Sequence, residues 1–448
     1  MLTEISTIIN YTTFILVPLY LISRYRKNKN WIFLNPCFYL LLGAYLYLTV
    51  SSTFIQSYIE RSSVSYYQTL SAESIQVTSL ICNWYVLVFV VFYFLSVDRK
   101  LILIKDFKPR KITYQFALIL VAILFIVQVY YLLRYAPTFV VASRSDGLNL
   151  YARQILNGPF RLRVTLKVFS VALGIVIWRT RNFYWLLLLI VPILTEFLSG
   201  GRTHSLSMIG FAYMTYLVIT GKTRIKLLFT SLIIYVTSVP ILRSYGSGNF
   251  IERFLDWESF LFKGFSEIFA TRLSTVIVYD QFSNSQDLLG YFRDSILSLF
   301  PSFIRSLLYN TERLTDLNYR TVLRDFYIIC CDIDWGLAGN FVTESLFYGG
   351  VGFALLSPLI IGLFFYSLNE TRLAKTFPGF MFLCLVISQS QFMMRTGFYD
   401  VIFILIYILL FYLGWLIWWE GGRFTFQTPK NRDFSKSQSR VTPKVDSN

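Results

Sequence analysis

Long apolar runs alternate with short polar segments along the whole chain, and several of these runs contain no charged residue at all. Roughly 18 to 20 apolar residues allow an α-helix to cross the hydrocarbon core of a bilayer. The pattern predicts eleven spanning helices, at residues 5–23, 31–55, 77–97, 114–133, 164–178, 183–199, 206–220, 225–242, 338–366, 377–393 and 399–419. We therefore expect an all-α polytopic membrane protein, because a helix satisfies its own backbone hydrogen bonds in lipid.

Composition supports the same class. Of the 448 residues, 55% are hydrophobic and only 15% are charged, which is too apolar for a soluble globular protein. The first run leads directly into a basic segment and has no basic residues before it. We expect it to remain as a membrane anchor and not to be a cleaved signal peptide.

The connections divide the chain into four parts. Residues 1–242 hold the first eight predicted spans, and residues 338–419 hold the last three. Between them, the connection at 243–337 is far longer than a turn requires, so we expect a folded cap. The tail at 420–448 is polar and basic, and we expect it to be disordered.

Lysine and arginine divide unequally between the two sides of this topology. One set of alternate connections holds 23 of the 41 cations, 12 of them lysine, at 24–30, 98–111, 179–182, 221–226, 369–375 and 420–448. Basic loops stay in the cytoplasm, so this set places the N-terminus outside and the C-terminus inside the cell. Apposition to the membrane surface accounts for the net charge of +16, and we expect no nucleic-acid partner.

The opposite set of connections keeps 17 cations, and all but Lys263 are arginine. The topology rule gives no reason for cations on this side. A guanidinium stays ionised, is weakly hydrated and binds phosphate through two hydrogen bonds. The pattern therefore indicates a phosphate-bearing ligand on the non-cytoplasmic face.

Few side chains are suited to metal or nucleophilic chemistry. The chain has a single histidine, His204, and five cysteines without the spacing of a zinc site. A Ser/His/Asp arrangement is not indicated either. Two of the cysteines, Cys330 and Cys331, are adjacent, and because a disulfide between neighbours is strained we expect two free thiols.

The most specific local motif lies between residues 198 and 205. Gly200 and Gly201 let the backbone approach a ligand closely, and Arg202 precedes a helix start whose N–H groups can hold a phosphate. A glycine-rich hairpin with Arg202 extended to the membrane surface is the structural alternative.

A second cation, Arg395, lies in the short turn between the last two spans and must therefore lie near the membrane boundary. It is a candidate for the same ligand. A structural ion pair with Asp400 explains it equally well.

Acidic residues next to apolar runs are candidates for a general base. Glu344 follows Gly339-Asn340-Phe341 at the start of the ninth span and precedes Gly349-Gly350-Val351-Gly352, and a carboxylate so placed is costly unless hydrogen-bonded or functional. Glu196 is a second candidate, for which pairing with Arg202 or another arginine is an equal alternative. Asp332 and Asp334 rank lower, because acids are common in loops.

These features together resemble the Wzy-type polymerases, which extend O-antigen and related repeat-unit polysaccharides in bacterial inner membranes. The resemblance covers most of the chain and rests on the number of spans, the large penultimate loop, the Gly200-Gly201-Arg202 turn, the Gly339 to Glu344 entry and the Arg395–Gly397 turn. It implies a GT-C-like membrane glycosyltransferase of the periplasmic face that needs no metal, no other cofactor and no nucleotide sugar.

The resemblance also implies the substrate and the partners. The substrate is an oligosaccharide linked to undecaprenyl pyrophosphate in the membrane lipid, and a chain-length regulator and a flippase are expected partners. For the site, it implies Glu344 as base with Asp334 in reserve, and Arg202 and Arg395 as stabilisers of the leaving pyrophosphate. Further contacts are expected from Arg144, Arg272 and Arg293.

Two other functions remain open from the sequence. An O-antigen ligase shares the architecture, but that family uses a histidine in the large loop, and His204 lies outside 243–337. A polysaccharide flippase or transporter should carry charges along its spans, whereas here Lys167 and Glu196 are the clear instances. A scaffold or lipid-binding partner of a polymerase is a third possibility.

Overall fold

The computed structural model describes residues 2–27, 34–62, 64–97, 111–141, 150–151, 154, 162–198, 203–220, 268–282, 319–331, 339–370 and 377–396. Within these ranges the regular elements are helices, and no strand occurs. The α-helices are α1 (Leu2–Lys27), α2 (Pro36–Ala44), α3 (Ser51–Arg61), α4 (Ala72–Val97), α5 (Lys111–Val141), α7 (Leu162–Thr180), α8 (Ile190–Leu198), α9 (Thr203–Thr220), α15 (Tyr319–Cys331), α16 (Phe341–Glu370) and α17 (Phe377–Thr396). Shorter helical elements are η2 (Tyr45–Val50), η3 (Ser65–Thr69), η5 (Phe183–Leu189) and η6 (Val278–Phe282), and a further helix covers residues 268–277.

Five described helical stretches are long and apolar enough to cross a membrane: Glu4–Arg24, Pro36–Arg61, Ala72–Val97, Thr113–Thr138 and Phe341–Asn369. Each falls on a predicted span, so the all-helical class is confirmed and the chain has the helices of a membrane protein. Shorter apolar helices cover Phe183–Glu196, Ser207–Thr220 and Gly379–Ser388. The predicted spans at 225–242 and 399–419 lie outside the described residues.

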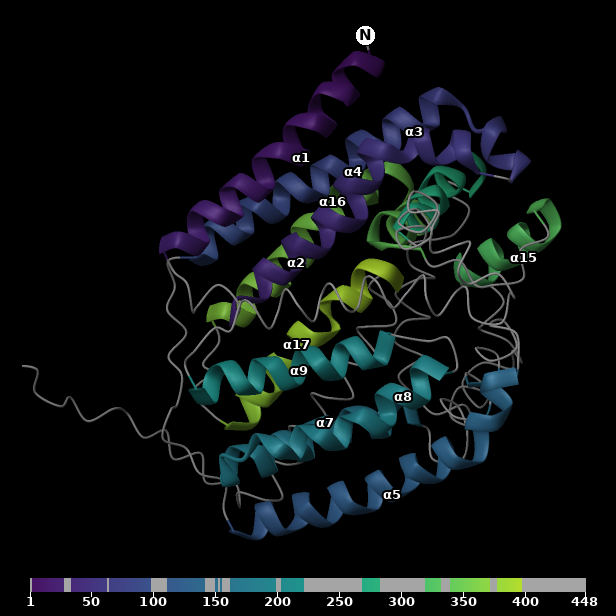
Figure 1. Cartoon of the computed structure of the whole chain (residues 1–448). Coiled ribbons are helices and arrows are strands. Elements are labelled where there is room, and N and C mark those ends of the chain that lie inside the picture. Colours follow the sequence, from purple (N-terminus) through teal and green to yellow (C-terminus); the bar gives the residue numbers. More distant parts are fainter. Residues whose placement is uncertain are drawn as a thin grey trace, which may run out of the picture.

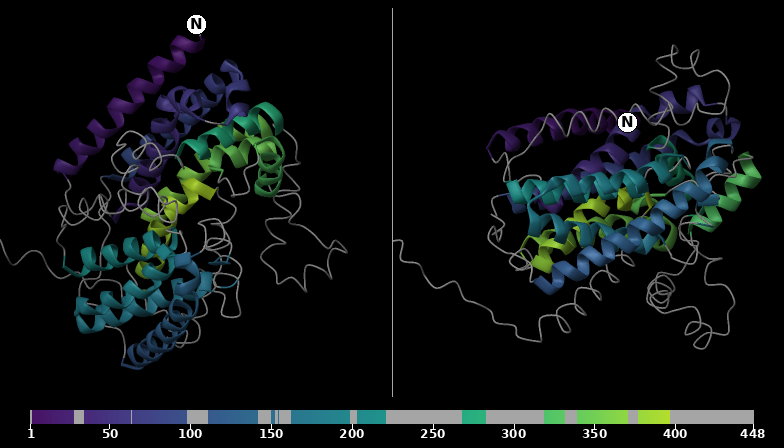
Figure 2. Two further views of the ribbon diagram at one scale, coloured as in Figure 1. Left: turned by 45° about the vertical axis from the view of Figure 1, so that its right-hand side comes forward. Right: turned by 60° about the horizontal axis from the view of Figure 1, so that its bottom comes forward.

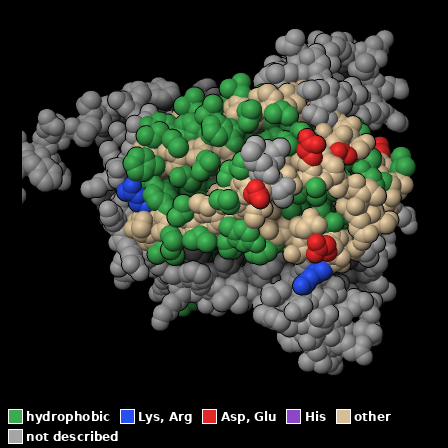
Figure 3. Space-filling view, turned by 90° about the horizontal axis from the view of Figure 1, so that it is seen from above, with side chains coloured by type: hydrophobic (Ala, Val, Ile, Leu, Met, Phe, Trp, Pro, Cys, Tyr) green, Lys and Arg blue, Asp and Glu red, His purple; other side chains and the backbone are tan. Residues whose placement is uncertain are grey.

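Several helices turn large apolar side chains outward, and the interior contains polar as well as apolar side chains. On α5, Ile126 and Leu133 are 66% and 72% exposed, whereas Asn83 on α4 is 1% exposed. Figure 3 shows the face at the top of Figure 1, where hydrophobic side chains cover most of the described surface. So much exposed apolar surface is unusual for a soluble monomer and suits contact with lipid.

The helices form two groups with α17 between them (Figures 1 and 2). One group contains α1, α2, α3, α4 and α16, and the other contains α5, α7, α8 and α9. Helix α17 packs against α2 of the first group and α9 of the second. The two groups are therefore joined by α17, a helix that comes late in the sequence.

Helices α1, α4 and α16 run in the same direction. Asn83 of α4 donates to Asn10 of α1, and further along both helices Arg24 stacks on the ring of Phe94. The second part of α16 follows α4 in the same way, through contacts of Tyr85 with Ser357 and of Phe92 with Tyr366. In the predicted topology these helices are the first, third and ninth spans. Successive spans cross the membrane in alternate directions, so odd-numbered spans all point the same way.

Helix α16 falls on the predicted span at 338–366, but the helix is broken at Gly350. Gly350 has φ 60° and ψ −159°, a conformation that is essentially restricted to glycine. A Cβ on the preceding Gly349 would overlap Phe353. The first segment, residues 341–349, is the α16 arm, and residues 351–370 form the long segment. Hydropathy cannot detect such a break, because the apolar run continues through it.

The adjacent cysteines at the end of α15 are joined, so the expectation of two free thiols is wrong. Cys330 and Cys331 form a disulfide with a Cα–Cα distance of 3.8 Å. The bond joins the last two residues of α15. The remaining cysteines, Cys37, Cys82 and Cys384, are free and buried.

Candidate functional site

A buried polar cluster lies where α3, α4, helix 268–277 and the α16 arm meet. Its central side chain is Arg272, which is 0% exposed. The Nε of Arg272 donates to Ser52 Oγ of α3 at 2.9 Å. Its NH2 donates to Thr78 Oγ1 at 2.8 Å and to Ser79 Oγ at 2.9 Å, both on α4, and to the Ile75 carbonyl at 3.2 Å. Helix 268–277 is thus attached to two candidate spans through one guanidinium.

The charge of Arg272 is held among neutral groups. In the described part of the chain its partners are three hydroxyls and one carbonyl, and its NH1 has no hydrogen-bond partner. Burial lowers the pKa of the guanidinium, with Cys82 opposing the shift, but arginine titrates so far above neutral pH that the charge remains. A buried charge without a counter-ion is costly, so the open edge at NH1 favours an anionic group.

One turn beyond Arg272, Thr275 contacts the start of the α16 arm. The hydroxyls of Thr275 and Thr343 are 2.9 Å apart, and Asn340 Nδ2 donates to Thr275 Oγ1 at 3.1 Å. Asn340 also caps the arm, because its Oδ1 accepts from the backbone N–H of Thr343 at 2.9 Å. These three side chains are 0% exposed.

Glu344 is the next residue of the arm and is 3% exposed. Its backbone N–H donates to the Asn340 carbonyl at 3.0 Å, so the carboxylate belongs to the first turn after the cap. The side chain interacts electrostatically with Tyr85 of α4. The Tyr85 hydroxyl contacts Ser345 Oγ at 3.1 Å and also Ser357 Oγ. The cluster therefore holds a carboxylate, a guanidinium and a phenol among helices from distant parts of the chain.

The second buried carboxylate, Glu196, caps another helix. The backbone N–H and the hydroxyl of Ser205 both donate to the Glu196 carboxylate. Ser205 lies in the first turn of α9, where free N–H groups and the helix dipole favour a negative charge. This geometry gives Glu196 a structural role that the sequence pattern did not predict.

Of the residues predicted from sequence, Glu344 and Arg272 lie in the same cluster. Arg395 lies near the end of α17, where its neighbour Met394 packs against Gly43 of α2, and its side chain is not among those described. The other predicted site residues lie outside the described residues: Arg144, Gly200, Gly201, Arg202, Arg293 and Asp334.

Sequence reasoning missed the polar residues that surround Arg272 and Glu344. A signal was present on α4, where Ser74, Thr78, Cys82 and Tyr85 recur at three- or four-residue spacing within an apolar run. Such a stripe marks a helix face turned toward other helices, since small polar side chains bond across helix contacts in lipid. Helix 268–277, whose Arg272 bonds to α4, gave no such signal in the sequence, because that helix is not an apolar span.

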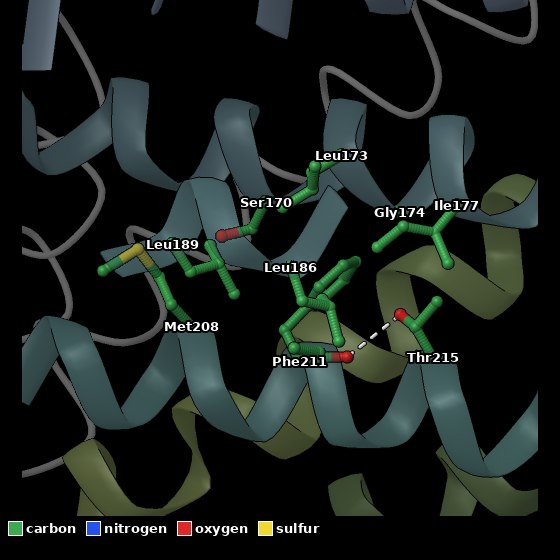
Figure 4. A pocket seen from close by; sticks show the side chains of 10 residues that line it. Ser170, Leu173, Gly174, Ile177, Leu186, Leu189, Met208, Phe211 and Thr215 are labelled. Atoms are coloured by element: carbon green, nitrogen blue, oxygen red, sulfur yellow. Dashed lines mark hydrogen bonds between the residues drawn. The ribbon is translucent and has the colours of Figure 1, made fainter. Parts of the chain in front are cut away.

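A small cavity between α7, η5 and α9 is a poor candidate for a site (Figure 4). Its volume of about 10 Å³ leaves room for about one water molecule. Its walls are mostly aliphatic and aromatic, and the hydroxyls of Ser170 and Thr215 already bond to carbonyls of their own helices.

The fold and the cluster define a helical protein with five described helices that are long and apolar enough to span a membrane, and with buried charged and polar side chains among them. Comparison with known proteins adds no relative: no family model, no curated protein and no solved structure matches this chain.

Proposed function

We propose that this protein is a polysaccharide polymerase of the bacterial inner membrane, similar to the Wzy-type enzymes. It transfers a growing glycan from undecaprenyl pyrophosphate to a lipid-linked repeat unit on the periplasmic face, in the synthesis of O-antigen or a related surface polysaccharide. The observation that carries the proposal is that the Arg272 guanidinium and the Glu344 carboxylate are both buried and belong to segments joined by the Thr275–Thr343 hydrogen bond. Transfer from a lipid pyrophosphate needs both a cation and a base.

The chemistry assigns each group a step. Glu344, with Asp334 in reserve, accepts the proton of the acceptor hydroxyl. The acceptor oxygen then bonds to the anomeric carbon of the donor sugar. The bond from that carbon to the pyrophosphate oxygen breaks, and the electron pair leaves with undecaprenyl pyrophosphate. Because the donor is already activated, the reaction needs no nucleotide sugar and no metal.

The arginines stabilise the charge that develops on the leaving group. Arg202 and Arg395 are the proposed principal contacts, beside the backbone at Gly200 and Gly201. Arg144, Arg272 and Arg293 add further contacts, and the Arg272 NH1, which is buried and has no hydrogen-bond partner in the described part of the chain, supports its inclusion. The proposed partners are membrane lipid, a chain-length regulator and a flippase, with the N-terminus periplasmic and the C-terminus cytoplasmic.

One observation favours a second function of a different class. The break at Gly350 divides α16 into two segments, and discontinuous helices form the substrate sites of many transporters. A polysaccharide flippase is therefore the alternative. A ligase has less support, since no described feature favours it over polymerase.

Deletion of the gene followed by electrophoresis of the surface glycan distinguishes these functions. Loss of a polymerase leaves lipid core capped with single repeat units, whereas loss of a flippase or a ligase leaves uncapped core. Complementation with Arg202→Ala, Arg395→Ala or Glu344→Ala should leave the single-unit product at normal protein levels. The exposed Arg179→Ala and Glu73→Ala serve as matched controls and should restore the ladder. Uncapped core in the deletion strain would contradict the polymerase proposal.

A further inference from the structure

The α16 arm needs an anchor outside its own helix. A continuous helix would orient Glu344 through its backbone hydrogen bonds with the following turns, but Gly350 interrupts that ladder. The arm therefore takes its position from side-chain contacts at its start and at its middle. Ser345 contacts the long segment and α4, and the Asn340–Thr343 turn contacts helix 268–277.

At the Asn340–Thr343 turn the contacts converge on the hydroxyl of Thr275. It bonds to Thr343 Oγ1 at 2.9 Å and accepts from Asn340 Nδ2 at 3.1 Å. Thr343 in turn lies directly before Glu344 in the chain. Since all three side chains are buried, no solvent is at hand to replace a lost bond.

Helix 268–277 is itself fixed. Arg272, three residues before Thr275, bonds to α3 and α4 through its Nε and NH2. The Thr275 hydroxyl is thus attached through one helical turn to two candidate spans. A chain of contacts runs from these spans through Arg272 and Thr275 to the turn that carries Glu344.

We propose that Thr275 is a positioning residue that sets the placement of Glu344, an inference that rests on the proposed role of Glu344 as the base. Thr275 does not touch the reacting atoms. Its hydroxyl holds the Asn340–Thr343 turn, and the turn holds the carboxylate. The charged and titratable groups described around the arm include Arg272 on helix 268–277 and Cys82 and Tyr85 on α4.

Labelling of buried carboxyl groups tests this placement directly. The purified full-length protein, in detergent, is treated with a hydrophobic carbodiimide, and the modification of Glu344 is followed by peptide mass spectrometry. Thr275→Val keeps the side-chain shape and removes the hydroxyl, whereas Thr275→Ser keeps the hydroxyl. Glu196, which is 2% exposed and lies on α8, is an internal control in the same sample.

Thr275→Val should speed the labelling of Glu344 about tenfold, because the arm opens locally once a buried hydrogen bond is lost. Labelling of Glu196 should not change, and Thr275→Ser should behave like the unmodified protein. Thr343→Val removes the same bond from the other side and should reproduce the effect if Thr275→Val folds poorly. Equal labelling of Glu344 in the valine variants and the unmodified protein would overturn the proposal, and so would a parallel rise at Glu196.

The same variants then separate this inference from the proposed function. With lipid-linked repeat units extracted from the deletion strain as probe, Thr275→Val should slow chain growth about tenfold to a hundredfold, and Thr275→Ser should not. If the unmodified protein produces no chain growth, the polymerase proposal fails, while the labelling result still decides the placement of Glu344. If the Thr275→Val protein extends glycan chains at the normal rate, the positioning role of Thr275 is refuted.

Discussion

The hydroxyls of Ser345 and Ser357 are hydrogen-bonded at 2.9 Å although the two residues are twelve positions apart on what the sequence presents as one helix. In a straight helix they would be separated by about 18 Å. The Tyr85 hydroxyl joins the pair from α4. The α16 arm is therefore held against the long segment, and this arrangement brings Glu344 into the interior.

Gly350→Ala should disrupt this arrangement. An alanine at φ 60° and ψ −159° is strained, and we expect a loss of about 1–3 kcal/mol in the free energy of unfolding. Thermal unfolding of the purified protein measures this loss. Gly352→Ala is the matched control, because a Cβ there meets no atom within 4 Å and should leave the melting temperature the same or higher. Equal behaviour of the two variants would show that α16 is not broken at Gly350.

Arg272→Lys should destabilise the protein although it keeps the charge. An ammonium cannot bond to Ser52 and to the Thr78–Ser79 pair at once, and it is more strongly hydrated than a guanidinium. We expect a loss of about 1.5–3 kcal/mol, the range for hydrogen bonds that involve a charged group. Arg179→Lys, on an exposed site of α7, should have no measurable effect. A stable Arg272→Lys protein would mean that the buried contacts of this guanidinium are not as described.

The sequence alone was sufficient for the helical membrane class, because the length and apolarity of the runs determine which segments cross a bilayer. It was not sufficient for the break in α16. The glycines at 349, 350 and 352 were visible, but only the backbone dihedral angles show that Gly350 is the one that turns the chain.

The candidate site was predictable only in its charged members. Glu344 stood out because charge is costly in or near lipid, and Arg272 was named only as a further contact implied by the family resemblance. Ser52 and Thr275 did not stand out, since a hydroxyl on a helix often bonds to its own backbone and carries no signal of a distant partner. Arg272 is 220 residues from Ser52 along the chain, so the pairing depends on tertiary packing.

The disulfide gives a prediction that can be checked without any substrate. Alkylation of the acid-denatured protein without reductant should modify three cysteines, Cys37, Cys82 and Cys384, and reduction should raise the number to five. A disulfide persists in an oxidising compartment, which agrees with the predicted periplasmic location of α15. Five reactive thiols before reduction would contradict the Cys330–Cys331 disulfide. The agreement with a periplasmic location of α15 would then be lost as well.

Arg202→Lys tests the proposed phosphate contact. A guanidinium that binds a phosphate through two hydrogen bonds cannot be replaced by an ammonium, whereas an arginine that merely extends to the membrane surface can. We expect the complemented deletion strain to retain single-unit-capped core at normal protein levels. A full ladder would assign Arg202 to the surface, and Arg395→Lys then becomes the next variant to examine.

Chain growth by the purified protein tests the central proposal most directly. The protein is incubated with lipid-linked repeat units from the deletion strain, without nucleotide sugar, and both the glycan ladder and released undecaprenyl pyrophosphate are measured. We predict one undecaprenyl pyrophosphate for each unit added, with growth abolished in Glu344→Gln and retained in the exposed control Glu73→Gln. Absence of growth with the unmodified protein, or undiminished growth with Glu344→Gln, would contradict the account.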